Sequence, residues 1–243
     1  MKKRWQLAIM LIVSILALVA CNNDKAEEQG QGISTETQEV EPDLTDVPDT
    51  VAEVNGQEIS REKFERTYLS QFQQAVLDAQ MSGQTFDQEQ FKRELTDSMI
   101  DLELLIQEAD RHQFTATDQD IGELVSALVE ENSLESEEVL YEIYEEQGMS
   151  RDQLREELTQ QIKLDQLISH QSEGLLVSEE QIIALYEELL AIYEEMEQEG
   201  ELPSLEEVRA DLENQIRYQE ENQLIIELIE QLRNESEIVN HLS

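Results

Sequence analysis

The chain has a single cysteine and three histidines, the side chains most often used in nucleophilic and metal chemistry. His112, His170 and His241 are widely separated in the sequence, and no HExxH or CxxC spacing accompanies them. The 57 Asp and Glu residues place carboxylate pairs throughout the chain, so such pairs say nothing about acid–base catalysis. The sequence also has no glycine-rich phosphate loop. We therefore predict no catalytic residue, no metal site and no cofactor, with the histidines at helix surfaces or helix ends.

Cys21 stands where a different chemistry is expected, because it ends an apolar run near the N-terminus. Residues 2–4 are Lys-Lys-Arg, and the run from Trp5 to Ala20 is polar at only two positions. A positive segment, an apolar segment and small residues before a cleavage site make up a secretory signal peptide. The run is shorter than the ~20 residues of a comfortable membrane span. The pattern predicts an exported protein with a signal peptide at 1–20, and an uncleaved anchor is the alternative.

The segment Leu18-Val19-Ala20-Cys21 resembles the lipobox of bacterial lipoproteins. The resemblance implies cleavage between Ala20 and Cys21 and acylation of Cys21 as the new N-terminus. One acyl chain anchors a protein only marginally, so the additional acylation of that family is what makes the attachment to the bilayer stable. We therefore expect an extracytoplasmic protein, lipid-anchored to the cell membrane through Cys21. An ordinary signal peptide with an incidental cysteine is the alternative.

Residues 21–50 are rich in acidic, amide and small polar side chains and poor in apolar ones. A segment of this composition cannot bury enough apolar surface to offset the entropy that ordering would cost. We predict an acidic flexible tether between the membrane anchor and a folded part.

The charge of the whole chain is strongly negative, with 16 Lys and Arg against 57 Asp and Glu, a net charge of −41. Nucleic-acid binding depends on cations that neutralise phosphates, so this composition excludes it. Adhesion to anionic headgroups also needs basic clusters, which the chain lacks after its signal peptide. The acidic surface fits cationic partners or a saline or alkaline exterior, or it is a solvated surface with no specific partner.

From residue 51 onward the sequence predicts a mainly α-helical fold with one short β-hairpin. The hairpin lies in Val51–Ser60, where Asn55-Gly56 is the preferred pair for a two-residue type I′ turn. Apolar residues at steps of three and four then predict helices, several of which open with a capping box. These helices are expected near 61–81, 85–109 (with its box at Thr85), 117–128, 139–147, 150–168, 178–192 and 204–232.

The order of several segments resembles the extracytoplasmic chaperones of the SurA/PrsA type. The resemblance implies a helical domain at 51–175 and a C-terminal helical segment at 176–243 that packs back on it and completes the same domain. The segments that carry the resemblance are Val51–Ser60, Met99–Ala109, Leu154–Ile162, Ser178–Tyr186 and Pro203–Val208.

One part of that family's pattern is missing here. PrsA-type foldases carry a parvulin prolyl-isomerase domain before the C-terminal helix, whereas the interval from Tyr186 to Pro203 is far too short for a domain. The resemblance therefore implies a holdase that binds unfolded or exported polypeptides without ATP and is not an enzyme. It identifies no client-binding residue. The alternatives are a scaffold lipoprotein with a specific folded partner and, less favoured, a prolyl isomerase.

Overall fold

The computed structural model describes residues 40–195 and 203–242. The predicted signal peptide, Cys21 and most of the predicted tether lie outside these residues. Leu44–Ser243 forms one compact unit. Residues 44–49, which the sequence groups with the tether, belong to this unit: Val47 is buried, and the Arg61 guanidinium donates to the Val47 carbonyl oxygen at 2.7 Å. In the described part of the chain, no helix combines the length and apolar composition that crossing a membrane requires.

The predicted hairpin is present and forms two strands of a three-stranded antiparallel sheet. β1 (Thr50–Val54) pairs with β2 (Gln57–Ser60) across a turn in which Asn55 and Gly56 have φ of 53° and 82°. Positive φ at both central positions is what a type I′ turn requires. On the other side of β1 lies β3 (Ile238–Asn240), from the very end of the chain, so the strand order is β2-β1-β3.

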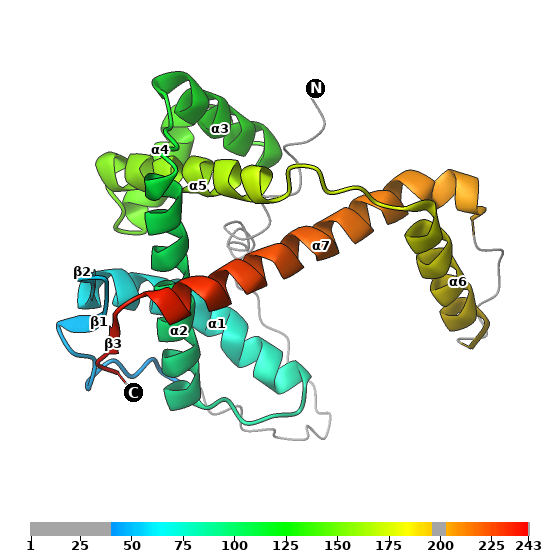
Figure 1. Cartoon of the computed structure of the whole chain (residues 1–243). Helices are drawn as coiled ribbons and strands as arrows, with labels where there is room; N and C mark the ends of the chain where they lie inside the picture. The colour runs from blue at the N-terminus through cyan, green and yellow to red at the C-terminus, as the bar shows by residue number, and fades with distance from the viewer. Residues whose placement is uncertain (1–39, 196–202, 243) are drawn as a thin grey trace, which may run out of the picture. The chain divides into compact units, whose positions relative to one another are not determined.

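Seven helices account for most of the described residues, as predicted (Figure 1). Most begin and end within a few residues of the expected positions. They are α1 (Arg61–Met81), α2 (Gln88–Arg111), α3 (Asp118–Glu131), α4 (Glu137–Glu146), α5 (Arg151–Gln171), α6 (Glu179–Glu195) and α7 (Leu205–Glu235).

Local capping explains most helix starts. At Ser150, Ser178 and Ser204, the side chain three residues further on accepts a hydrogen bond from the serine N–H, which confirms the predicted boxes. The predicted helix α2 is present, but its predicted capping box at Thr85 was wrong, because Asp87 is the N-cap and accepts a hydrogen bond from the Gln90 N–H at 3.0 Å. Aspartate is as good an N-cap as threonine or better, so the chain begins the helix two residues later.

The main core lies around α1, α2 and β1. Phe64, Tyr68 and Phe72 of α1 are almost fully buried, and their rings continue to Phe86 and Phe91 at centroid distances between 5.1 and 5.9 Å. Offset and edge-on aromatic pairs of this kind add stability beyond the apolar area they bury. The helical spacing of the α1 aromatics was therefore a correct indication of the core.

α7 is 31 residues long, or roughly 46 Å, and contributes to two separate hydrophobic clusters. Near its end Leu232 is buried, and Arg233 Nε donates to Asp101 Oδ1 of α2 at 2.5 Å. Near its start Leu212 and Ile216 form a small core with Ile182 of α6. The predicted packing of the C-terminal helix on the preceding helices is confirmed. The middle of α7, between the two clusters, is only partly covered.

Candidate functional site

The predicted site residues Ala20 and Cys21 lie outside the described residues, so cleavage and acylation stay predictions. His112 and His170 lie at helix ends, as expected, whereas the expectation was wrong for His241, which directly follows β3 and donates its backbone N–H to Val51 of β1. In the described part of the chain, His, Cys, Asp and Glu form no group of three or more that could hold a metal ion.

Two of the histidines meet in space, which their distance in the sequence did not reveal. His112 is the C-cap of α2, His170 lies in the last turn of α5, and their ring centroids are 4.9 Å apart. His112 stacks on Phe114, and its Nε2 lies 3.0 Å from a carboxylate oxygen of the buried Glu108. These contacts join the ends of two packed helices, so they have a structural explanation.

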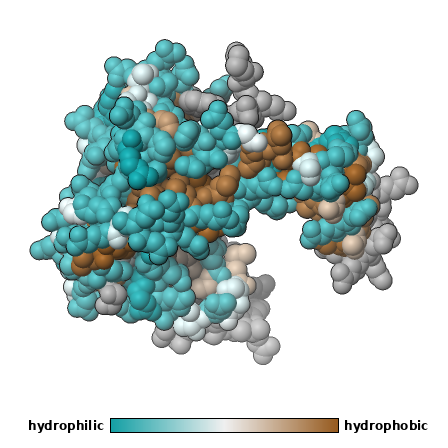
Figure 2. Space-filling view, in the orientation of Figure 1, coloured by the Kyte–Doolittle hydropathy of each residue, from teal (hydrophilic) through white to brown (hydrophobic). Residues whose placement is uncertain are grey.

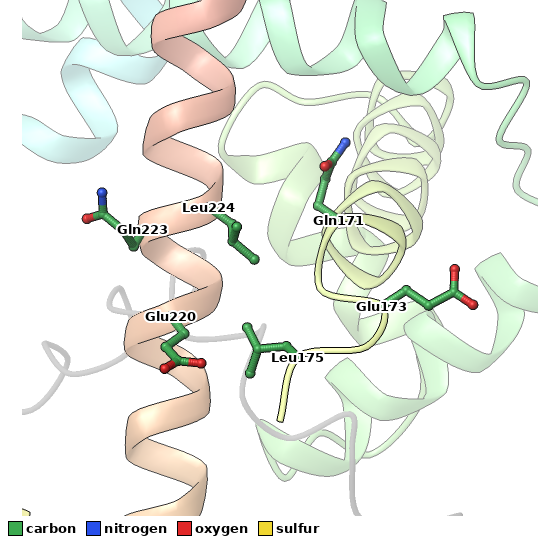
Figure 3. A pocket seen from close by; sticks show the side chains of 6 residues that line it. All are labelled: Gln171, Glu173, Leu175, Glu220, Gln223 and Leu224. Carbon is green, nitrogen blue, oxygen red and sulfur yellow. The ribbon is translucent and has the colours of Figure 1, made fainter. Parts of the chain in front are cut away.

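A pocket of about 380 Å³ opens between the end of α5 and the middle of α7. Leu175, from the α5–α6 connection, and Leu224, from α7, both project into it (Figure 3). We call it the Leu175–Leu224 pocket, and its other lining residues are Gln171, Glu173, Glu220 and Gln223.

Backbone geometry at the end of α5 places the first leucine. Gly174 has φ of 89°, a left-handed conformation that glycine adopts without strain, and it lets the chain leave the helix axis. The Leu175 N–H then donates to the Ser172 carbonyl at 3.1 Å, which holds the connection in a tight turn. Leu175 therefore faces α7 rather than continuing the α5 helix.

The second leucine belongs to a run that no single helix face can bury. Residues 224–229 read Leu-Ile-Ile-Glu-Leu-Ile, which is apolar on nearly all sides of α7. Leu224 is partly exposed in the pocket, whereas Ile226, about 200° around the helix, is 51% exposed and does not line it. Apolar side chains therefore remain in contact with solvent where α7 passes between its two clusters.

The apolar surface extends beyond the pocket itself. Leu176, next to Leu175, is 85% exposed. Figure 2 shows apolar atoms gathered over the α5–α6 connection and along the middle of α7, bordered by hydrophilic surface. Contiguous exposed apolar surface with a polar border is typical of interaction sites.

A second hollow of about 420 Å³ adjoins the pocket, and Glu173 lines both. Its other lining residues include Phe114 and His170, so it presents an aromatic wall. Glu173 Oε2 lies 3.9 Å from His170 Nδ1. The Leu175–Leu224 pocket and this aromatic hollow therefore meet at Glu173.

The charge around the pocket is negative. Glu173 and Glu220 are its only ionisable lining residues, and they come from opposite sides. Gln181 of α6 donates a hydrogen bond to Glu220, and within the described part of the chain no Lys or Arg forms an ion pair with Glu220. The arrangement can hold an apolar side chain beside Glu220, with Glu173 at the opposite rim.

Comparison with protein families gives this arrangement its context. The model of the SurA-like N-terminal domain matches residues 1–168 of the chain. The chain belongs to the SurA-like N-terminal domain family. A comparison with curated proteins found no match.

The SurA-like N-terminal domain is the chaperone part of its protein class and not the catalytic part. Such domains generally bind unfolded polypeptides. No parvulin domain is evident in the described residues, and only seven residues, 196–202, separate the two described segments. The matched region ends before the pocket, whose residues lie at 171–175 and 220–224.

No client-binding residue was predicted from the sequence, and this pocket was not anticipated. Two signals could have indicated it: a Leu-Leu-Val run directly after the helix-ending Gly174, and an apolar run in α7 too wide for one helix face. Neither signal shows that the two runs lie side by side, because they are separated by the whole of α6.

Proposed function

We propose that this SurA-like protein is a membrane-anchored extracytoplasmic holdase that binds unfolded or exported polypeptides at the Leu175–Leu224 pocket. The observation that carries the proposal is the partly exposed apolar pocket and its apolar surroundings, on a member of a chaperone-type family. A pocket of about 380 Å³ is large enough for one apolar side chain of an extended segment.

Binding of this kind needs no ATP. A client segment that docks loses conformational freedom, which offsets much of the apolar contact and keeps the affinity low. Weak binding lets the client leave when its own core forms, because folding then buries the same apolar side chains. The sequence has no phosphate-binding loop that would couple release to a nucleotide.

The anchor and the tether complete the proposal. The lipobox-like segment that ends in Cys21 supports acylation, and the acidic stretch that follows supports a flexible connection. A holdase attached in this way stays near the membrane surface, where exported chains emerge unfolded. A prolyl isomerase is not part of the proposal, because no parvulin domain is evident in the described residues.

Aggregation of a denatured client tests the proposal. Residues 44–243, which form one compact unit, should suppress light scattering at a near-stoichiometric ratio. Leu224→Gln should weaken client binding about fivefold, because about 1 kcal/mol of apolar contact is lost. Ile226→Gln is the control, since it removes a more exposed apolar side chain of the same helix that does not line the pocket.

Two results would contradict the proposal. Equal effects of Leu224→Gln and Ile226→Gln would show that the pocket is not the binding site. A complete lack of suppression with several clients, together with stoichiometric binding of one folded partner, would favour the scaffold lipoprotein instead.

A further inference from the structure

We infer that the Leu175–Leu224 pocket selects polypeptide segments in which an apolar side chain is flanked by Lys or Arg. This inference rests on the proposed holdase function and adds to it the chemical class of the client. Two features support it. The floor of the pocket, formed by Leu175 and Leu224, is apolar, and the acids of its rim, Glu173 and Glu220, complement a cationic side chain.

The geometry places the Glu220 carboxylate beside the apolar floor and Glu173 at the opposite rim. Glu220 and Leu224 are four residues apart on α7, so they lie on the same helix face. In Figure 3, Leu175 and Leu224 project into the space between α7 and the α5–α6 connection, and Glu220 lies beside them. An apolar side chain seated between the leucines would place a neighbouring cation near Glu220.

The other carboxylate lies at the opposite rim. In Figure 3 the Glu173 side chain points away from the two leucines, toward the border with the second hollow. It is 82% exposed and can turn over the rim toward a bound cation. With Glu173 turned over the rim, a segment that crosses the pocket meets an acid before and after its apolar anchor.

The rim acids are available to a client because few cations of the chain lie near them. The two arginines in the first half of α7 form ion pairs with other acids. Arg217 pairs with Glu213. Arg209 pairs with Glu179 and lies 3.9 Å from Glu206. Glu220 keeps only the neutral donor Gln181 among the partners found in the described chain. About two turns further along α7, Glu227 likewise accepts a hydrogen bond from a neutral amide, that of Gln223.

The net charge of −41 strengthens this selection at long range. A field of one sign raises the local concentration of cationic segments and repels anionic ones, and salt screens both effects. At the pocket, an exposed ion pair contributes modestly, so two of them should change affinity about five- to tenfold. Selection should therefore be clear at low salt and weak at high salt.

Three fluorescent peptides with the same central Leu-Phe-Leu segment, flanked by Lys, Gln or Glu, test the inference. Their binding to residues 44–243 is measured by fluorescence anisotropy in about 20 mM and about 500 mM NaCl, where screening lengths differ several-fold. We expect the Lys-flanked peptide to bind about five- to tenfold more tightly than the Gln-flanked one at low salt, and the Glu-flanked peptide to bind most weakly. At high salt the three affinities should converge.

A matched pair of variants separates the rim from the overall charge. The double variant Glu173→Gln, Glu220→Gln should lose most of the preference for Lys-flanked peptides and keep its affinity for the Gln-flanked one. The control Glu187→Gln, Glu188→Gln removes the same charge from exposed positions of α6 and should keep the preference. Circular dichroism of each variant checks that the helices are intact.

The outcomes distinguish this inference from the proposed function. Equal binding of all three peptides at low salt would overturn the cationic selection and leave the holdase standing. An equal loss of preference in both double variants would overturn the assignment to the pocket rim. Failure of every peptide to bind, with aggregation of denatured clients unaffected, would overturn the proposed function itself.

Discussion

At the scale of single residues, folding raises the pKa of two half-buried acids on α5. Burial raises the pKa of the Asp165 carboxyl, and a hydrogen bond from Gln161 Nε2 at 2.9 Å opposes the rise only in part. Burial likewise raises the pKa of Glu157, although Arg66 lies nearby. Each acid is therefore harder to ionise in the folded protein than in the unfolded chain, which costs stability at neutral pH.

Replacing Asp165 by Asn should raise the melting temperature at pH 7, because the folded protein no longer holds a partly buried charge. The sign follows from linkage. When folding raises the pKa of a carboxyl, the protein loses stability as the pH rises from the pKa of the unfolded chain, about 3.9, through the pKa of the folded protein. The gain should therefore shrink as the pH falls toward 4 and Asp165 becomes protonated in both states. Thermal unfolding of residues 44–243, followed by circular dichroism, measures the melting temperature at pH 7 and near pH 4.

Asp211→Asn on α7 is the control, because Asp211 is exposed and its replacement removes the same charge without removing a buried one. It accounts for the general benefit of lowering a large negative charge. An Asp165→Asn gain no larger than the Asp211→Asn gain at pH 7 would contradict the role of burial.

At the scale of elements, α7 divides into three parts with different roles. Its end packs with α2, its start packs with α6, and its middle lines the Leu175–Leu224 pocket beside the end of α5. Leu232 is buried in the first of these contacts and Leu212 in the second, while Leu224 stays partly exposed between them. The same residue type on one helix therefore serves two cores and a surface.

Leu212→Ala and Leu232→Ala should destabilise different parts of the protein. Each removes a buried leucine and should cost about 2–4 kcal/mol, because transfer free energy is lost and a cavity remains. Leu212→Ala should speed amide hydrogen exchange in α6 and the first half of α7 and leave α2 and α5 protected. Leu232→Ala should instead reduce protection in α2 and the second half of α7.

The corresponding control is Leu224→Ala, which should cost under about 1 kcal/mol because the side chain is already partly exposed. An identical exchange pattern for Leu212→Ala and Leu232→Ala would contradict the division of α7 into separate clusters, since it would mean that all helices unfold as one unit.

At the scale of the whole molecule, the proposed function depends on where the chain is held. The folded unit Leu44–Ser243 carries the pocket, and the predicted anchor at Cys21 lies more than twenty residues before it. A composition like that of residues 22–43 is typical of flexible segments, which allow a binding site to reach chains at various distances.

Cys21→Ala in the full chain should abolish lipid attachment, because alanine has no thiol to acylate. We expect the variant either to be released from the membrane or to remain as an uncut precursor, with acyl labelling lost in both cases. Metabolic labelling with a palmitate analogue and fractionation of expressing bacteria measure these outcomes. Asn22→Ala should be processed and labelled normally, and unchanged anchoring and labelling of Cys21→Ala would contradict the lipobox.

Local sequence determined the hairpin turn, the helices and most of their caps. The physical reason is that these features depend on interactions over a few residues: Asn55-Gly56 accepts positive φ, and a serine caps the helix that follows it. The one cap that was misplaced, at Thr85, was also a local choice, between two residues that both cap well. Apolar spacing also identified the buried face of α1 correctly, because helical periodicity is itself local.

Tertiary structure alone decided the third strand, the meeting of His112 with His170 and the Leu175–Leu224 pocket. These features join segments that are far apart in the chain; for example, the Asn55 side chain donates to Ser236 Oγ, 181 residues away. Short patterns cannot specify such pairs, because each partner's local signal is compatible with many neighbours. Which of the apolar residues of α7 enter a core and which stay exposed for a client depends on where α5 and α6 lie, and only the folded chain places them.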